Sequence, residues 1–286
     1  MRERLAAFER AAAAQLPPAE RPPMRLHAAM RYAVLDGGKR VRPLLVSAAC
    51  EAAGSHDAAA QCAALAVEFI HAYSLIHDDL PCMDDDVLRR GKPTVHVAFD
   101  EATAMLAGDA LQAEAFRALT EAPLPAEVRA ALCAELANAI GSAGMCGGQA
   151  LDLAAVGQPL TLPELERMHR MKTGSLLVAA VRMGALAAQA PAALLAALNR
   201  YAQAVGLAFQ IVDDILDVQA SSAQLGKTAG KDAAQHKPTY VSVLGLDVAR
   251  VRAQALHAEA LAALAPLGTP ARHLRELADL IVLRDH

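Results

Sequence analysis

Five aspartates lie within nine positions of one short segment, HDDLPCMDDDVLRRGK, which spans residues 77–92. Two like charges about 4 Å apart repel by about 4 kcal/mol near a protein surface. Such a cluster opposes folding unless a cation neutralises it. The segment therefore predicts a cation-binding site formed by Asp78, Asp79, Asp84, Asp85 and Asp86.

A second acidic cluster lies in FQIVDDILDV, residues 209–218. Asp213 and Asp217 are four positions apart, so they share one face of a helix. Both clusters adjoin apolar segments that are typical of buried helices. Packed antiparallel or nearly so, the two helices would face eight carboxylates across a cavity. Such an all-oxygen site suits Mg²⁺, which commonly binds a few carboxylates, water and the phosphates of a substrate.

Basic residues lie beside both clusters and beside the breaks in the chain. Arginine forks bind phosphate oxygens in pairs, and lysine supplies a compact charge. One such residue is more often an ordinary surface residue, but the repeated placement favours phosphate binding. The positions are Lys39, Arg40, Arg42, Arg89, Arg90, Lys92, Lys172, Lys227, Lys231 and Lys237.

The composition favours helices over sheets. Of the 286 residues, 55% are hydrophobic but only 3% are aromatic, so the apolar residues are mostly alanine and leucine. Both are strong helix formers. With 27 basic and 31 acidic residues, the formal net charge is −4, and nothing in that balance suggests nucleic acid as a partner.

The cysteines and the N-terminal segment indicate a soluble cytoplasmic protein. Five cysteines are odd in number and include no C-x-x-C pair, so they are expected to be free thiols in a reducing compartment. The segment MRERLAAFERAAAAQ is charged and amphipathic, unlike a signal peptide. No uncharged run reaches the roughly 18 residues of a membrane span.

The elements that must position these charges are predicted to be successive helices, separated by proline, glycine and polar turns. The sequence TLPE from Thr161 has the capping-box pattern that opens a helix. Alternating β-branched runs, repeats and long linkers are missing, so we expect one all-α domain over residues 1–286. The expected helices cover residues 2–15, 23–36, 42–53, 57–79, 94–107, 109–121, 126–140, 161–189 and 192–218, with a glycine-rich break at 141–149, a polar loop at 221–238 and two more helices after it.

Six motifs follow one another along most of the chain. They are GGKRVRP (37–43), DDLPCMDDDVLRRGKPT (78–94), GGQALDL (147–153), KTG (172–174), FQIVDDILD (209–217) and GKTAGKD (226–232). In this order they resemble the trans-isoprenyl diphosphate synthases, most closely the bacterial farnesyl diphosphate synthase type.

The resemblance implies an antiparallel helix bundle around a deep central cavity, in a homodimer. The implied reaction joins isopentenyl diphosphate to dimethylallyl or geranyl diphosphate and gives farnesyl diphosphate by ionisation, condensation and elimination. Three Mg²⁺ ions would hold the allylic diphosphate. Their ligands would be Asp78, Asp84 and Asp213, with Asp217 acting through water.

The resemblance also assigns residues to the substrates. Those that match positions binding isopentenyl diphosphate are Lys39, Arg42, His71 and Arg90. Those around the allylic diphosphate and its tail are Arg89, Lys172, Thr173, Gln210 and Lys227. The residues expected to act directly in the reaction are Asp78, Asp84, Arg89, Lys172, Asp213 and Lys227. The carboxylates expected only to tune the local field are Asp79, Asp85, Asp86 and Asp214.

Product length is expected to depend on the floor of the cavity. Ser74 and Tyr73 lie four and five residues before Asp78, roughly 6 and 7.5 Å along a helix. An aromatic residue at that depth, with Pro81 and Cys82 in the acidic motif, resembles the bacterial fifteen-carbon enzymes. Tyr73 is therefore predicted to form the floor, and the alternative is a core tyrosine whose hydroxyl has a partner.

Other functions leave part of the sequence unexplained. The pairs Glu68–His71 and Glu166–His169 are compatible with a di-iron bundle, but that function ignores both acidic clusters. Terpene cyclases share the first acidic motif and usually not a second one rich in aspartate. Non-catalytic partner subunits of heteromeric synthases typically lose one acidic motif, whereas this chain keeps both. Products of ten or twenty carbons stay open, as does a contribution to the site from Arg284.

Overall fold

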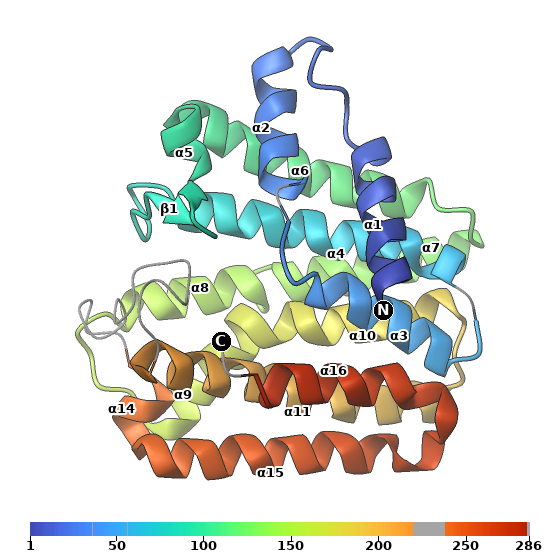
Figure 1. Ribbon diagram of the computed structural model, residues 1–286, viewed down its shortest axis with the longest axis vertical. Coiled ribbons are helices and arrows are strands. Elements are labelled where there is room, and N and C mark those ends of the chain that lie inside the picture. Colours follow the sequence, from blue (N-terminus) through green and yellow to red (C-terminus); the bar gives the residue numbers. More distant parts are fainter. Residues whose placement is uncertain (36, 56, 220–237, 285–286) are drawn as a thin grey trace.

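The protein is built of helices stacked in layers (Figure 1). The computed structural model describes residues 1–284 apart from residues 36, 56 and 220–237. The all-α class predicted from the sequence is confirmed. The elements are α1 (Arg2–Gln15), α2 (Met24–Leu35), α3 (Val41–Ala52), α4 (Asp57–Asp78), β1 (Leu88–Arg89), β2 (Lys92–Pro93), α5 (Val95–Ala98), α6 (Glu101–Thr120), α7 (Ala126–Ile140), α8 (Met145–Ala154), α9 (Leu162–His169), η1 (Arg170–Gly174), α10 (Ser175–Ala187), α11 (Ala192–Gln219), α14 (Tyr240–Leu244), α15 (Leu246–Leu264), η2 (Ala265–Leu267), η3 (Thr269–Ala271) and α16 (Arg272–Val282).

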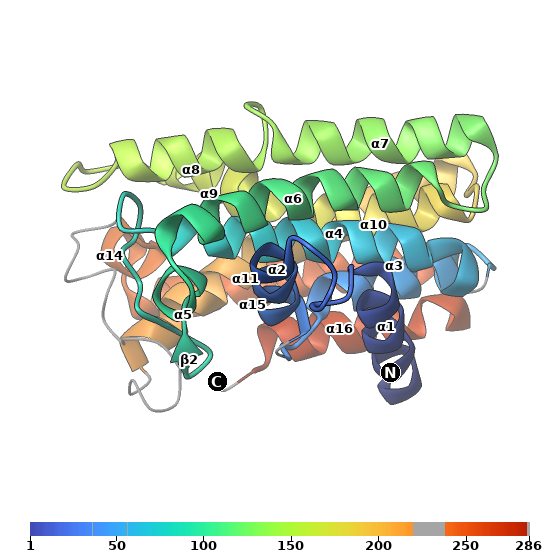
Figure 2. The ribbon, with the colours of Figure 1, turned by 90° about the horizontal axis from the view of Figure 1, so that it is seen from above.

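The two long apolar helices, α4 and α11, each pack against α10. Helix α6 packs on α4, α15 packs on α11, and α10 contacts α3, α4, α7 and α11. Figure 2 shows α7 and α8 following one another along one face. Buried side chains from α1 through α16 belong to one continuous apolar core.

Helices α4 and α11 also meet the length and hydropathy of a membrane span. Within their most apolar windows, 67% of the residues of the first and 50% of those of the second are buried inside the protein. Their apolar character is therefore explained by packing in the core of the bundle.

A short hairpin follows the first acidic segment. Strand β1 pairs antiparallel with β2, with Leu88 opposite Pro93. The turn residues Arg90 and Gly91 have φ of 55° and 76°, the left-handed conformation that two-residue hairpin turns require. The hairpin places Arg89 and Arg90 next to the end of α4.

One glycine was expected to separate two helices, but it lies inside α6. A Cβ on Gly108 would lie 2.1 Å from the Nε2 atom of His77, whose ring contacts the carbonyl oxygen of Met105 at 3.0 Å. The glycine therefore permits close contact between α6 and α4. The predicted helices at 94–107 and 109–121 are instead the short α5 and one continuous α6.

The helix predicted at 161–189 begins as expected but is divided. Thr161 and Glu164 form the predicted capping box at the start of α9. Residues 170–174 then form a π-helical turn, η1, a feature that is frequent at functional sites. A Cβ on Gly148 would lie 2.1 Å from the backbone nitrogen of Lys172. The glycine-rich segment thus brings α8 against η1, and its second half is helical.

A buried ion-pair cluster ties the first helices to α4. Arg40, at 3% exposure, contacts Glu68 at 2.8 Å from one nitrogen and Glu9 at 2.7 Å from another. Arg40 lies beside the chain break, as predicted, but its two glutamate partners favour a structural role over phosphate binding.

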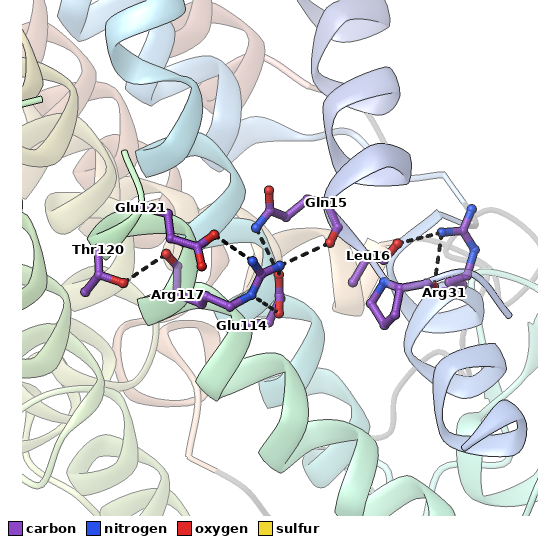
Figure 3. Close-up of polar contacts among 8 residues, drawn as sticks. Gln15, Leu16, Arg31, Glu114, Arg117, Thr120 and Glu121 are labelled. Carbon is purple, nitrogen blue, oxygen red and sulfur yellow. Dashed lines mark hydrogen bonds and ion pairs between the residues drawn. The ribbon is translucent and has the colours of Figure 1, made fainter. Parts of the chain in front are cut away.

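The end of α1 is held by polar contacts to α2 and α6 (Figure 3). The Nε2 atom of Gln15 donates to Glu114 at 3.0 Å. The guanidinium of Arg117 donates to the carbonyl oxygen of Gln15 at 3.4 Å, and Arg31 donates to the carbonyl oxygen of Leu16 at 3.2 Å. These contacts hold the N-terminal helices against the bundle.

Candidate active site

A cavity of about 570 Å³ lies between α4, α6, α8, η1 and α11. Part of its lining, the charged wall, consists of Asp78, Arg89, Lys172 and Asp213. Another part, the neutral wall, consists of Tyr73, Met105, Met145 and Cys146. The arrangement provides charge stabilisation and an apolar compartment within one space.

The first acidic segment turns back on the end of α4. The backbone N–H of Asp84 donates to the carbonyl oxygen of Asp78 at 2.9 Å, and that of Asp86 donates to Asp79 at 3.2 Å. These bonds satisfy carbonyl groups that the helix end leaves open. The turn therefore brings Asp84 back towards Asp78.

Asp78 is held in an environment that disfavours its charge. Burial raises the pKa of Asp78 to about 6, and the carboxylates of Asp84 and Asp79 add to that rise. Lys172 and Arg89 oppose it. A bound cation would favour the charged form and reverse the shift.

The expectation that eight carboxylates face one another across the cavity is wrong. Among the described residues of the two clusters, Asp78 and Asp213 line it. Asp79 is turned to Arg89, whose Nε atom lies 2.9 Å from each carboxylate oxygen. Successive residues of a helix project about 100° apart, so neighbouring aspartates cannot all face one space.

The relative direction of α4 and α11 also differs from the expectation. Asp78 is the last residue of α4, and Asp213 lies in the second half of α11, near its end at Gln219. Both line the same cavity. Because both clusters lie towards the C-terminal ends, the two helices must run in the same direction, as Figure 1 shows.

One face of α11 presents Phe209, Asp213 and Asp217 at successive turns. The guanidinium of Arg284 pairs with Asp213 at 2.6 Å and lies 4.4 Å from the centre of the Phe209 ring. Arg284 thus contacts Asp213 at the charged wall, a contribution that the sequence left open. Asp217 is buried, one turn beyond Asp213.

The carboxylates fit Mg²⁺ bound together with a diphosphate. Among the described residues, no three His, Cys, Asp or Glu side chains lie close enough to hold a metal ion by themselves. Mg²⁺ commonly uses one or two carboxylates and takes water and substrate phosphate as its other ligands. The raised pKa of Asp78 agrees with this fit, because a bound cation would offset the burial and the neighbouring carboxylates that disfavour its charge.

The glutamates of the E-x-x-H pairs have other partners. Glu68 pairs with Arg40 at 2.8 Å, and Glu166 pairs with Arg252 at 3.3 Å. The di-iron alternative requires both glutamates as metal ligands. Their ion pairs argue against that alternative.

A second pocket of about 480 Å³ adjoins the cavity. Arg42, His71, Arg90 and Phe209 line both spaces. Lys39 completes the lining on the α3 side. The four residues that the resemblance assigns to isopentenyl diphosphate therefore lie together in one pocket.

The electrostatics of this pocket favour an anion. Burial lowers the pKa of Lys39, and the nearby Arg284 lowers it further. Burial likewise lowers the pKa of Arg42, while burial and the surrounding arginines hold that of His71 well below its usual value. Among the described residues, the buried Nε atom of Arg42 has no hydrogen-bond partner. An anionic group here would relieve the repulsion and supply that partner.

The Gly37-Gly38 break is needed for this pocket. The guanidinium of Arg90 donates to the carbonyl oxygen of Gly37 at 2.5 Å. A Cβ on Gly38 would lie 2.7 Å from the same guanidinium, and its φ is +137°. Glycine at position 38 therefore lets Arg90 close one side of the pocket.

The π-helical turn η1 presents Lys172 and Thr173 to the cavity. The Nζ atom of Lys172 donates to Asp152 at 2.6 Å. Although burial opposes its charge, Asp78 and Asp152 raise the pKa of Lys172. The hydroxyl of Thr173 donates to Gln210 at 3.1 Å. Arg89, Lys172, Thr173 and Gln210 are thus brought together at the charged wall.

Three predicted lysines are not described by the structure, and two residues at the site were not assigned from the sequence. Lys227, Lys231 and Lys237 lie outside the described residues. Asp152 and Phe209 were not assigned roles from the sequence. The signal for Phe209 was its spacing of four residues from Asp213, which puts both on one helix face. Asp152 belongs to the GGQALDL motif, but nothing in the sequence indicates its partner, because Lys172 is twenty residues away.

Comparison with known proteins agrees with this geometry. The family model described as polyprenyl synthetase matches residues 23–264. The farnesyl diphosphate synthase of Escherichia coli (strain K12) is 52% identical over 264 residues, which are 90% of this chain and 88% of that protein. A probable farnesyl diphosphate synthase of Sinorhizobium fredii is 53% identical over 88% of this chain and 77% of that protein. A chloroplastic geranylgeranyl pyrophosphate synthase of Catharanthus roseus is 47% identical over 93% and 76%.

Solved structures show the same architecture. An FPP/GFPP synthase of Zymomonas mobilis superposes with a TM-score of 0.89 at 45% identity and covers 98% of this chain and 96% of its own. A geranyltransferase of Helicobacter pylori, complexed with magnesium and isoprenyl diphosphate, has a TM-score of 0.87 at 36% identity and covers 98% and 94%. The chain belongs to the polyprenyl synthetase family.

Proposed function

We propose that this protein is a prenyltransferase that joins isopentenyl diphosphate to dimethylallyl and geranyl diphosphate and releases farnesyl diphosphate. The observation that carries the proposal is the pairing of two spaces with complementary chemistry. The pocket of Lys39, Arg42, His71 and Arg90 suits a free diphosphate, and the adjoining charged wall suits a diphosphate bound with Mg²⁺. The bacterial relatives named farnesyl diphosphate synthase support the product.

In the proposed reaction the carbon–oxygen bond of the allylic diphosphate breaks, and the diphosphate leaves with the bonding electrons. Lys172 and Arg89, at the charged wall, stabilise the negative charge that develops on it. Mg²⁺ held by Asp78, Asp84, Asp213 and Asp217 would neutralise part of the same charge. The neutral wall keeps water from the allylic cation.

Condensation then needs the second substrate at a defined place. The second pocket, lined by Lys39, Arg42, His71 and Arg90, is called the isopentenyl pocket. It holds the diphosphate of this substrate, so that the double bond lies towards the cavity. The electrons of that bond form the new carbon–carbon bond, and a proton is lost to the departed diphosphate. No protein carboxylate is required as a base. His71, neutral because its pKa is well below the usual value, can bind without adding charge.

The floor of the cavity is proposed to set the product length. Tyr73 is 8% exposed, and its hydroxyl lies 3.5 Å from the Sγ atom of Cys146 across the neutral wall. Its ring packs edge-on against His77 at 5.3 Å. Ser74 also lines the cavity and bonds back to the carbonyl oxygen of His71 at 2.9 Å. These contacts hold the aromatic ring where a growing chain would meet it.

We further propose that the chain folds as one domain and acts as a homodimer in the cytoplasm. The continuous core supports the single domain. Size-exclusion chromatography with light scattering measures the oligomeric state directly.

Incubation with radiolabelled isopentenyl diphosphate and dimethylallyl or geranyl diphosphate, with Mg²⁺ or with EDTA, tests the function. We expect a Mg²⁺-dependent fifteen-carbon diphosphate on chromatography. A twenty-carbon product would move the assignment towards the geranylgeranyl pyrophosphate synthases, such as the relative of Catharanthus roseus with 47% identity. A complete lack of condensation with every primer would favour a non-catalytic partner subunit.

A further inference from the structure

The second aspartate of the pair on α11 points away from the cavity. Asp214 is 2% exposed and is not part of the cavity lining. One of its oxygens accepts the Nε2–H of Gln210 at 2.8 Å. The other accepts the backbone N–H of Tyr240 at 2.7 Å. Among the described residues, the carboxylate therefore accepts from donors on α11 and α14, and the Nε2 atom of His169 lies 4.0 Å from it.

The contact to α14 is itself firmly placed. The ring of Tyr240 is fully buried and stacks on that of His169, with centroids 5.5 Å apart and an angle of 21°. A backbone N–H can only donate, so the Tyr240 side of Asp214 must be an acceptor. This end of the hydrogen-bond chain has a fixed direction.

That direction is transmitted to Thr173. A carboxylate only accepts, so Gln210 must turn its amide nitrogen to Asp214 and its carbonyl oxygen to Thr173. The hydroxyl of Thr173 has one proton, which it donates in a hydrogen bond to the carbonyl oxygen of Gln210 at 3.1 Å. Lone pairs of that hydroxyl are left for the cavity, which Thr173 lines.

We propose that Asp214 is a positioning residue that fixes the proton direction of the Thr173 hydroxyl, so that a lone pair faces the reacting carbon. A lone pair attracts an allylic cation, whereas an O–H would repel it. Asp214 thus acts through Gln210 and contributes no metal ligand. The inference rests on the proposed condensation, because the cation belongs to that reaction.

The substitution Asp214→Asn reverses the direction of the hydrogen bonds from Asp214 through Gln210 to Thr173, with almost no change in side-chain shape. The new asparagine side chain must still accept from the Tyr240 N–H, so its amide nitrogen faces Gln210. Gln210 then turns its oxygen to that amide and its nitrogen to Thr173, whose own proton is pushed towards the cavity. With Mg²⁺, geranyl diphosphate and isopentenyl diphosphate, we expect kcat to fall about ten- to a hundredfold. The KM for isopentenyl diphosphate should stay unchanged.

Two further variants separate positioning from a structural role. In a Thr173→Val background the hydroxyl is missing, so Asp214→Asn should lower kcat no further. The double variant Asp214→Asn/Gln210→Glu moves the carboxylate from position 214 to position 210, the next member of the hydrogen-bond chain. The introduced glutamate then accepts from both the introduced asparagine and Thr173, so kcat should recover most of the loss.

Equal losses in the wild-type and Thr173→Val backgrounds would overturn the inference, and so would a double variant as slow as Asp214→Asn. If Asp214→Asn fails to fold, the double variant decides alone, since its rate is near wild type only when the Thr173 direction is restored. A wild-type protein that condenses nothing would refute the proposed function instead, which keeps the two failures distinct.

Discussion

Buried charge is arranged in opposite ways in two regions of this molecule. On the α1 side of the isopentenyl pocket, Arg40 contacts Glu9 and Glu68, and although burial opposes its charge, the two glutamates raise its pKa. Among the basic residues of the same pocket, burial lowers the pKa of Lys39 and of Arg42, and although Asp213 and, for Arg42, Glu68 oppose that shift, both pKa values stay lowered. At the charged wall, burial and other carboxylates raise the pKa of Asp78 to about 6.

The difference separates charges that stabilise the fold from charges that await a ligand. Opposite charges in contact favour each other's charged form and stabilise the folded state. Like charges gathered in one place favour the neutral form and reduce stability, which is typical of functional sites. An anion would stabilise the cations of the pocket, and a further cation would stabilise Asp78, whose burial Lys172 and Arg89 do not offset. Diphosphate with Mg²⁺ supplies both.

The largest effect is expected from Asp78→Asn. The side chain keeps its shape but can no longer offer a charged ligand, so turnover should fall about a hundred- to a thousandfold. Because burial disfavours the charge of Asp78, the melting temperature should not fall. Steady-state kinetics and thermal unfolding of the same sample measure both.

Asp85→Asn is the matched control for this variant. Asp85 is exposed, and its φ of 51° is one that asparagine tolerates well. Turnover and stability should both stay near wild type. The comparison of the two regions fails if Asp78→Asn keeps its rate or melts well below the wild type.

In the paired region, Glu68→Gln should instead lower stability. Glu68 and Arg40 have side chains exposed by 3% and 1%, and removing one charge of such a buried pair costs about 3 kcal/mol. Glu9→Gln removes the other partner of the same arginine. Because the Glu9 side chain is 34% exposed, its loss should be below about 1 kcal/mol. Urea unfolding of both variants tests this, and equal losses would contradict it.

Substitutions in the neutral wall should change the length of the product and leave the binding of the diphosphates unchanged. Tyr73→Ala removes the ring that closes the floor, so products longer than fifteen carbons should accumulate while the KM for isopentenyl diphosphate stays the same. Tyr73→Phe removes only the hydroxyl that faces Cys146 and should keep the fifteen-carbon product. An unchanged product distribution in Tyr73→Ala would defeat the assignment of the floor.

The smallest effect is expected at Glu51, in another paired cluster of the body. Although burial opposes it, hydrogen bonds from His273 and Arg4 lower the pKa of Glu51 below its usual 4.5. A lowered acid pKa stabilises the fold above the unfolded value, and that contribution is lost as the pH falls through the folded value. Above pH 5, the free energy of unfolding of the wild type should thus exceed that of Glu51→Gln by at most about 1 kcal/mol. This difference should shrink below pH 4.5. Urea unfolding at a series of pH values measures it, and a constant difference would contradict the assignment.

Helix boundaries were largely predictable because proline, glycine and capping residues act locally. The bounds of α1, α2, α3, α4, α7 and α11 agree with the predicted segments to within a residue or two. Predictions failed where a distant contact decided the outcome. Gly108 stays helical because His77 packs on it, and the segment after His169 becomes a π-helical turn against α8.

The candidate site divides in the same way. Motif order placed Lys39, Arg42, His71 and Arg90 in one functional group, and the structure brings them into one pocket. It could not indicate that Asp79 turns to Arg89 and Asp214 to Tyr240, because those orientations depend on partners supplied by other elements. Asp152 was missed for the same reason.

By itself, the sequence determined the helical class, the family and the residue types at the site, since composition, periodicity and motif spacing are local properties. Only the tertiary structure decided which side chains face the cavity and which carry the fold. Adjacent aspartates look alike in the sequence, but a helix separates their directions by about 100°. The packed neighbours on each side then decide whether a carboxylate such as Asp78 awaits a cation or one such as Asp214 holds a hydrogen-bond chain in place.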